Sequence, residues 1–317
     1  MIFIVADQMK WSALRMYSEI GVEAPSLERL AREGVRFANG ITPHPLCVPA
    51  RVSMMTSRYA HSTGSRRNET LMPPGELHAF RIWKDLGYST GLVGKNHCFD
   101  HPSDIELIDV LCELPHLKPP NRGITGPTRG MEWIVPEDVI KASHETRINM
   151  PEQSPAISYA VTDHDIEGYS TNAVTSQSEA FIERAASGDT FGNGESNTKE
   201  TPPFALFVSY NDPHHPLEVP RKYAEMVPAE SITLPPLREG EFSGTDSPER
   251  NRVLYEILSL QYDQIGDVRN AVAVYLAMVR MVDDGVGRIL NKLDELNLRD
   301  NTIVVFTADH GDFAGEH

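Results

Sequence analysis

Four short runs rich in apolar and β-branched residues constrain the fold of this chain more than any other feature. They lie at residues 1–6, 88–93, 204–210 and 302–308, and polar side chains follow each of them closely. Such runs are typical of strands that are buried on both faces of a parallel sheet. Because helical patterns separate them, the alternation predicts an α/β fold with a doubly wound, mainly parallel sheet flanked by helices.

Two short helices are expected in the first third of the chain. Residues 26–33 follow a helical pattern, with Ser26 as a candidate cap and Gly34 as the stop. Residues 76–86 repeat this pattern, and Gly87 ends it. Both helices would connect predicted strands, as a doubly wound sheet requires.

The middle of the chain is the least regular part. Proline, glycine, serine and asparagine are frequent from about residue 100 to 201, so we expect a variable insertion there, with a mobile loop at 188–203 and one helix within 171–186. No run is apolar and long enough to span a membrane. A long helix follows near the end of the chain, and its predicted apolar face consists of Leu276, Val279, Val282, Val286, Ile289, Leu293 and Leu296.

Pairs of metal-ligand residues follow two of the predicted strands. Asp7 and Gln8 come directly after the first strand, and Asp309 and His310 come directly after the last one. Because the carboxyl ends of parallel strands meet at one edge of a sheet, these side chains are expected to converge there. Two carboxylates, an amide oxygen and an imidazole predict a site for a divalent cation.

A thiol is expected at the start of a helix within residues 47–58. Pro49 suits the first helical position, because its backbone has no N–H to leave unpaired. Cys47 would then face the positive end of the helix, and Arg51 could return its guanidinium toward the same spot. The segment therefore predicts a nucleophile in an anion-binding corner, whereas the structural alternative is a buried cysteine before an ordinary helix.

The composition limits the kinds of partner that the protein is expected to bind. The 317 residues include 45 acidic and 29 basic ones, and the resulting net charge of −16 argues against nucleic acid or an anionic membrane surface as the main partner. Cys47, Cys98 and Cys112 do not form a disulfide framework, and the opening residues are too short and lack the basic start of a signal peptide. These features leave the location of the protein open, with the cytoplasm as the default expectation.

Residues 47–51 have the form Cys-x-Pro-Ala-Arg, and together with residues 56–58 they resemble the signature of the type I sulfatase family. The resemblance implies an alkaline-phosphatase-like fold and hydrolysis of a sulfate ester, on a small molecule or a saccharide. It also implies that a formylglycine-generating maturation enzyme converts Cys47 to an aldehyde, whose hydrate attacks sulfur. A hydrate offers a route to release the sulfate that a plain serine ester lacks.

The resemblance assigns further roles. It places Lys95 on the sulfate, His97 beside the aldehyde hydrate and His214 near the leaving oxygen, while Asn68 matches an asparagine that phosphonate-hydrolase-like relatives use on the anion. An ammonium can neutralise a sulfate oxygen, and a histidine that titrates near neutrality can move a proton. Arg51 would stabilise the transferring group together with Lys95.

The resemblance also assigns Asp7, Gln8, Asp309 and His310 to one divalent metal, with Ca²⁺ as the first expectation and Mn²⁺ or Zn²⁺ as alternatives. An Asp-Gln pair stands where many sulfatases carry Asp-Asp, which is similar to choline-sulfatase-like and phosphonate monoester hydrolase-like enzymes. A phosphonate monoester or phosphodiester hydrolase is therefore an alternative. A non-catalytic protein that binds sulfated ligands and a hydrolase that uses a bare cysteine thiolate are two others.

Three further polar residues lie beside these motifs, and the sequence predicts less specific roles for them. His215 is expected to support its neighbour or lie at the surface, and Asp312 and His317 are expected in the turn after the last strand. The whole of residues 1–317 is expected to form a sulfatase catalytic domain. Because the chain ends directly after a motif, we expect it to be the N-terminal part of a longer enzyme whose C-terminal subdomain is missing.

Overall fold

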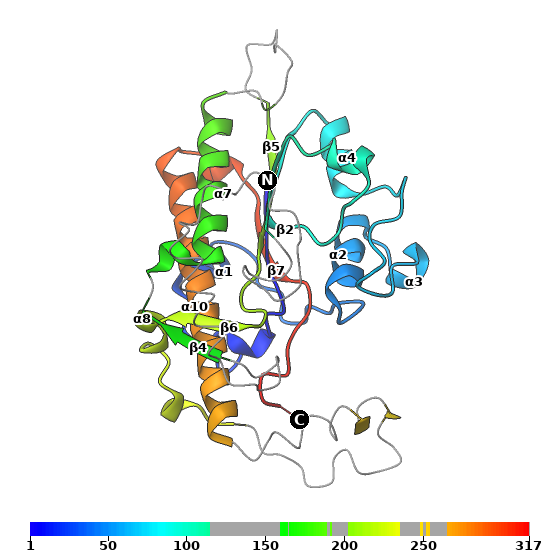
Figure 1. Cartoon of the computed structure of the whole chain (residues 1–317). Coiled ribbons are helices and arrows are strands. Elements are labelled where there is room, and N and C mark those ends of the chain that lie inside the picture. The colour runs from blue at the N-terminus through cyan, green and yellow to red at the C-terminus, as the bar shows by residue number, and fades with distance from the viewer. Residues whose placement is uncertain are drawn as a thin grey trace.

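A computed structural model describes residues 1–114, 159–163, 165–188, 191, 202–234, 248–249, 252–253 and 265–316, with the side chains of residues 265–267 excepted. Within these residues the centre is a five-stranded sheet in the order β3-β2-β5-β1-β7, and all its neighbouring strands are parallel (Figure 1). This arrangement confirms the predicted α/β class. The strands are β1 (Ile2–Ala6), β2 (Ser89–Lys95), β3 (Val110–Leu114), β5 (Phe204–Tyr210) and β7 (Val304–Ala308).

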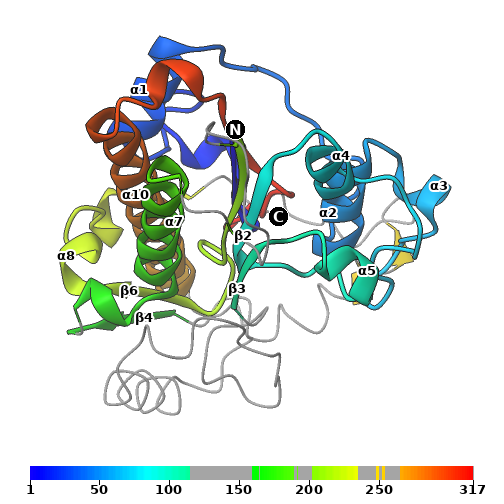
Figure 2. The same cartoon turned by 90° about the horizontal axis from the view of Figure 1, so that it is seen from above.

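Helices cover both faces of the sheet and form a three-layer arrangement (Figure 2). One outer layer contains α1 (Pro25–Glu33), α7 (Ser170–Ala186) and α10 (Ile265–Glu295). The other contains α2 (Cys47–Thr56), α3 (Ala60–Thr63), α4 (Ala79–Asp85) and α5 (Pro102–Ile105).

Short elements complete the described part of the chain. A second, two-stranded parallel sheet forms beside α10, and α8 follows it. The sequence did not predict this sheet or β3, because all three strands are only four or five residues long in a region of irregular composition. These elements are β4 (Tyr159–Thr162), β6 (Leu217–Pro220), α8 (Arg221–Ala224) and the 3₁₀ turns Trp11–Ala13, Ile166–Gly168, Ala229–Ser231 and Arg299–Asn301.

The central strands are apolar throughout because they are buried on both faces. Along β1, Ile4 belongs to the core under α7 and α10, whereas Val5 belongs to the core under α2 and α4. Both side chains are fully buried. Side chains alternate between the two faces of a strand, so a sheet with helices on both sides needs continuous apolar runs rather than alternating ones.

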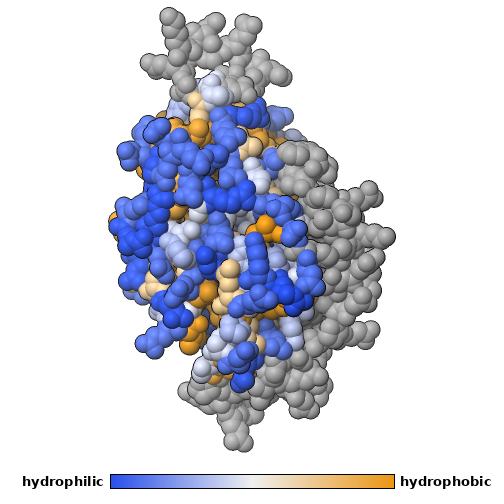
Figure 3. Space-filling model, turned by 90° about the vertical axis from the view of Figure 1, so that its left-hand side faces the viewer, coloured by the Kyte–Doolittle hydropathy of each residue, from blue (hydrophilic) through white to orange (hydrophobic). Residues whose placement is uncertain are grey.

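The long helix α10 confirms its predicted apolar face except at Leu296, which follows the end of the helix and is partly buried. Its apolar positions pack onto the core, and the outer surface over α7, α8 and α10 is mainly hydrophilic (Figure 3). No helix among the described residues combines the length and the apolar character that a membrane span requires. Most of the predicted loop at 188–203 lies outside the described residues. The buried face of α10 includes Leu276, Val279, Val282, Val286, Ile289 and Leu293.

Two helix starts differ from the prediction. The first short helix begins at Pro25, and Ser26 is not its cap, because Asp283 of α10 accepts hydrogen bonds from the backbone N–H groups of Ser26 (3.1 Å) and Leu27 (2.8 Å). A carboxylate from a distant helix thus caps the start of α1. The helix α4 begins at Ala79 rather than at residue 76, where the chain still forms a turn in which Glu76 donates to the carbonyl of Pro73.

Gly94 is required where β2 meets β5. Its φ of 99° lies in the left-handed region, and a Cβ there would overlap the carbonyl oxygen of Ser209. Gly87 also has a positive φ, of 79°, but a Cβ there would meet nothing within 4 Å. Gly87 is therefore a matched control that carries the backbone strain without the clash.

We predict that Gly94→Ala lowers the free energy of unfolding by about 3–5 kcal/mol, because strain and overpacking add. Gly87→Ala should cost only about 1–2 kcal/mol. Urea unfolding of both variants measures the difference. Equal losses would contradict the tight approach of β2 to β5.

Candidate active site

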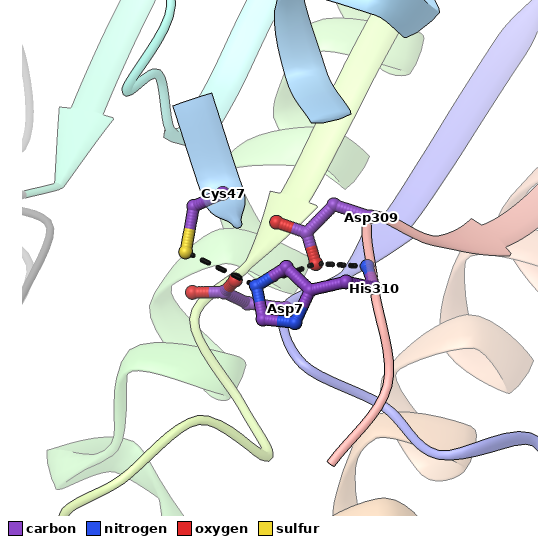
Figure 4. A group of neighbouring side chains, drawn as sticks. All are labelled: Asp7, Cys47, Asp309 and His310. Carbon is purple, nitrogen blue, oxygen red and sulfur yellow. Dashed lines mark hydrogen bonds and ion pairs between the residues drawn. The ribbon is translucent and has the colours of Figure 1, made fainter. Parts of the chain in front are cut away.

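Four side chains from three distant parts of the chain meet at the carboxyl edge of the central sheet (Figure 4). Asp7 follows β1, Asp309 and His310 follow β7, and Cys47 begins α2. Their ligand atoms all lie within 4.8 Å of one another. The predicted convergence of the strand ends is thus present in the structure, and a cysteine lies among them.

Cys47 is the first residue of α2, two positions earlier than the predicted start at Pro49. Proline at the third position is tolerated because the N–H groups of the first turn have no partner inside the helix. Asn68 accepts a hydrogen bond from the backbone N–H of Val48 at 3.2 Å. Asn68 therefore lies at the helix start, where it caps one N–H group close to Cys47.

The Cys47 thiol is buried and lies 3.2 Å from Nε2 of His310. Nδ1 of His310 lies 2.9 Å from the carbonyl oxygen of Gly311. Because a carbonyl only accepts, Nδ1 carries the ring proton and Nε2 presents a lone pair to the thiol. Burial and the charge of Asp7 raise the pKa of Cys47 to about 12. The unmodified thiol is therefore protonated at neutral pH, which argues against a hydrolase that uses a bare thiolate.

Arg51 connects the ends of three strands. Its Nε donates to Oδ2 of Asp309 at 2.9 Å, and its Nη1 donates to Oγ of Ser209 at 2.7 Å and to the carbonyl of Lys95 at 3.1 Å. Burial opposes its charge, but Asp309 and then Asp7 raise the pKa of Arg51 above its ordinary value. Arg51 is therefore a fixed, buried cation.

Asp7 is fully buried beside two cations. Lys95 Nζ donates to its Oδ2, and Arg51 Nη2 lies 3.6 Å from its Oδ1. Burial alone would raise the pKa of Asp7, but Lys95 and Arg51 outweigh it and lower that pKa to about 2. Among the described residues, Oδ1 accepts no hydrogen bond. A charged, buried carboxylate oxygen without a hydrogen bond fits a site for a cation.

Gln8 lies at the edge of this cluster. Its φ of 62° is left-handed, and its backbone N–H donates to Oδ1 of Asp309 at 3.0 Å. The side-chain amide of Gln8 donates to Oδ2 of Asp312. The hydroxyl of Tyr275 donates to the backbone carbonyl of Gln8 at 2.9 Å. Asp312 lies in the turn after β7, as predicted, and also anchors the Gln8 amide. The predicted His317 lies outside the described residues.

Lys95 is the last residue of β2, and His97 lies in the loop that follows it. His97 has a left-handed φ of 46° and is partly exposed. Asn96 holds this turn with its side chain, because its Nδ2 donates to the carbonyl of Phe99 at 2.8 Å and its Oδ1 accepts from the N–H groups of Phe99 (2.9 Å) and Cys98 (3.3 Å). The side chain of Asn96 thus sets the backbone that presents His97.

His214 lies in the loop after β5 and is 7% exposed. Its Nδ1 lies 2.7 Å from the carbonyl oxygen of His215, so Nδ1 carries the ring proton. Burial and the charge of Lys95 lower the pKa of His214 to about 2, which keeps the ring neutral. The preceding Asp212 accepts hydrogen bonds from Ser170 (3.3 Å) and Thr171 at the start of α7, and these bonds fix the loop.

Sequence reasoning missed three residues that support the site. Ser209 orients Arg51, Tyr275 binds the backbone at Gln8, and Asn96 closes the turn at His97. Ser209 and Asn96 stand close to predicted strand ends, so a search for polar residues there could have found both. Tyr275 lies in the middle of α10 and had no local signal.

The carboxyl edge of the parallel sheet thus brings carboxylates, an imidazole and two buried cations together. The sulfatase family model matches residues 1–317, and the chain belongs to the sulfatase family. It is 27% identical to an ulvan-active sulfatase of Formosa agariphila over 318 residues, which cover 99% of this chain and 50% of the relative.

Solved structures show the same fold. The phosphonate monoester hydrolase of Agrobacterium radiobacter matches with a TM-score of 0.67 and 19% identity over 100% of this chain and 63% of that one. Ps i-CgsB in complex with k-i-k-neocarrahexaose matches with a TM-score of 0.63 and 22% identity over 99% of this chain and 59% of that one. These likenesses confirm an alkaline-phosphatase-like fold. The chain spans about half the length of the curated relatives it matches.

The depressed pKa of His214 predicts a pH-dependent stability. Between pH 6.5 and about 2 the unfolded chain holds a proton on this ring that the folded chain does not, so acidification favours unfolding. Between pH 7 and 5 this proton lowers the free energy of unfolding by about 2 kcal/mol. Replacing His214 with Asn should remove it, so the variant should lose about 2 kcal/mol less stability than the parent between pH 7 and 5.

Urea unfolding at both pH values measures this effect. The exposed His61→Asn is the control for the loss of a histidine, and it should follow the parent protein. A His214→Asn variant with the same pH dependence as the parent would contradict a neutral, buried His214.

Proposed function

We propose that the protein hydrolyses sulfate monoesters, with Cys47 converted to formylglycine as the nucleophile and one divalent metal beside it. The observation that carries this proposal is the meeting of Cys47 with Asp7, Asp309 and His310 within 4.8 Å. Membership in the sulfatase family supports the same reaction. Residues 1–317 would then hold the catalytic part of the enzyme.

Asp7, Asp309 and His310 would hold the metal, with Gln8 as a fourth ligand from the position next to Asp7. The set fits a hard cation because it is dominated by oxygen atoms, and Ca²⁺ remains the first expectation, with Mn²⁺ or Zn²⁺ as alternatives. When bound, the metal would supply Lewis-acid polarisation of the transferring group.

The charges of this chain's own side chains suit an anionic substrate. Arg51 and Lys95 carry two positive charges, and Asp7 and Asp309 carry two negative ones, so these four groups are neutral together. A divalent cation would leave the site with a formal charge of +2. At the sulfate site this local positive charge would outweigh the repulsion from the protein's net charge of −16.

In the first step, one hydroxyl of the hydrated aldehyde at position 47 releases its proton to solvent as its oxygen attacks sulfur, and the bond between sulfur and the alcohol oxygen breaks. Arg51 and Lys95 stabilise charge on the sulfuryl oxygens. His214 protonates the leaving alcohol. Because its ring is neutral in the free site, His214 must first gain a proton, and the negative charge of a bound sulfate favours this protonation.

In the second step, His97 removes the proton of the remaining hydroxyl. The carbonyl re-forms, the bond between carbon and the sulfate oxygen breaks, and inorganic sulfate leaves. Water then restores the hydrate. Asn68 would contact the anion or the helix start beside it, since it already binds the N–H of Val48.

A sulfated saccharide is the substrate class we propose first. The relative from Formosa agariphila is named for activity on ulvan, and the i-CgsB structure contains a neocarrahexaose. The maturation enzyme that generates formylglycine would be the one protein partner that this chemistry requires.

Hydrolysis of a phosphonate monoester or phosphodiester is the second candidate. It is favoured by Gln8, which stands beside Asp7 where many sulfatases carry a second aspartate. Both substrate types present a tetrahedral anion to the same cations, so a direct comparison of turnover separates them.

We predict that the full-length enzyme, co-expressed with a formylglycine-generating enzyme and supplied with Ca²⁺ or Mn²⁺, turns over an aryl sulfate faster than an aryl phosphonate monoester. Cys47→Ala should lower both activities by at least about 1,000-fold, because it removes the nucleophile. A preference for the phosphonate would favour the second candidate. A mature enzyme that turns over neither ester would favour a sulfated-ligand-binding protein.

A serine at position 47 separates the two chemical steps. Cys47→Ser should accept one sulfuryl group per active site and then stop, because a sulfate ester of serine has no second hydroxyl to expel the sulfate. Intact mass spectrometry after mixing with an aryl sulfate measures the adduct. Sustained multiple turnover by this variant would contradict the proposed mechanism.

A further inference from the structure

The turn that follows β1 has a conformation that its sequence does not favour. Asp7 and Gln8 are neighbours, and in an extended chain neighbouring side chains point to opposite faces. Both can face one ion only if the backbone turns between them. The φ of 62° at Gln8 provides that turn, and residues other than glycine seldom adopt such a value. Contacts from outside the turn must therefore hold it in place.

A single hydroxyl from the middle of α10 contacts both sides of this turn. The hydroxyl of Tyr275 donates to the backbone carbonyl of Gln8 at 2.9 Å and accepts from the backbone N–H of Lys10 at 2.7 Å. A phenol can make both bonds at once, because its oxygen both donates and accepts. Tyr275 is only 3% exposed, so water does not replace these bonds at little cost.

We propose that Tyr275 is a positioning residue for the metal site. Its hydroxyl holds the turn in which Asp7 and Gln8 face the same ion, so the protein binds that ion without first having to order the turn. The inference rests on the proposed function, which assigns Asp7 and Gln8 as ligands. Tyr275 itself binds the backbone of the turn and is not a ligand.

The other contacts of the turn come from the segment after β7. The N–H of Gln8 donates to Oδ1 of Asp309 at 3.0 Å, and the side-chain amide of Gln8 donates to Asp312. Asp309 is itself a proposed ligand, so a bound ion would compete with Gln8 for its carboxylate. The Tyr275 hydroxyl is uncharged and belongs to a core helix, so its two hydrogen bonds do not compete with the ion.

The first test measures ion affinity in the full-length, formylglycine-containing protein after treatment with EDTA. Ca²⁺ and Mn²⁺ are titrated by calorimetry, and the variants are compared on the ion that the parent protein binds more tightly. Tyr275→Phe keeps the ring and removes the hydroxyl. It should weaken binding of that ion by about 10-fold or more, as expected for the loss of a group that orients a metal ligand.

Tyr210→Phe is the matched control. Tyr210 is also fully buried, and its hydroxyl lies 2.9 Å from Oγ1 of Thr175 in α7. Its backbone carbonyl accepts from the N–H of Asp7 at 3.1 Å, so the control residue is adjacent to the site as well. Both variants lose a buried phenol hydroxyl, but Tyr210→Phe should bind the ion as tightly as the parent protein. Equal affinities in the two variants would overturn the inference.

Hydrogen exchange of the Lys10 amide, measured without any ion, tests the contact itself. This N–H should be protected in the parent and in Tyr210→Phe, and should exchange at least about 10-fold faster in Tyr275→Phe. An unprotected Lys10 amide in the parent would overturn the inference, even if a variant failed to fold.

The parent protein separates failure of this inference from failure of the proposed function. If the parent binds neither ion, the inference is overturned together with the metal of the proposed function. If the parent binds an ion and Tyr275→Phe binds it equally well, the inference alone is overturned.

Discussion

Two buried ion pairs hold the carboxyl edge of the sheet together, and the rest of the site depends on them. Arg51 from α2 binds Asp309 after β7, and Lys95 at the end of β2 binds Asp7 after β1. Removing one partner would leave a charge uncompensated in the interior, which typically costs about 3–5 kcal/mol. Each carboxylate has a cation beside it, and the low pKa of Asp7 keeps that carboxylate in the ionised form that can hold a metal ion.

The same environment keeps neighbouring groups in different protonation states. Asp7 remains charged because Lys95 and Arg51 outweigh its burial, whereas the thiol of Cys47 and the ring of His214 remain neutral because burial dominates. A neutral thiol is a poor nucleophile, so the proposed modification at position 47 would give the site a reactive group that the bare side chain does not provide. This difference links the geometry to the proposed formylglycine chemistry.

The parts of the site that follow local rules could be predicted from sequence. Asp7 and Asp309 directly follow apolar strands, and parallel strands bring such residues to one edge. Partners that come from distant elements could not. Asp283 caps α1 from α10, and Tyr275 binds the backbone at Gln8 across 267 positions of the chain. The short strands β3, β4 and β6 were also missed, because pairing rather than local composition stabilises them.

The dependence of activity on modification at position 47 tests the formylglycine nucleophile most directly. Preparations of the full-length protein with different fractions of formylglycine at position 47, measured by peptide mass spectrometry, can be assayed on one aryl sulfate under identical conditions. A formylglycine nucleophile predicts an activity that rises in proportion to that fraction and extrapolates to zero for the unmodified chain. Activity that is independent of the fraction would contradict a formylglycine nucleophile.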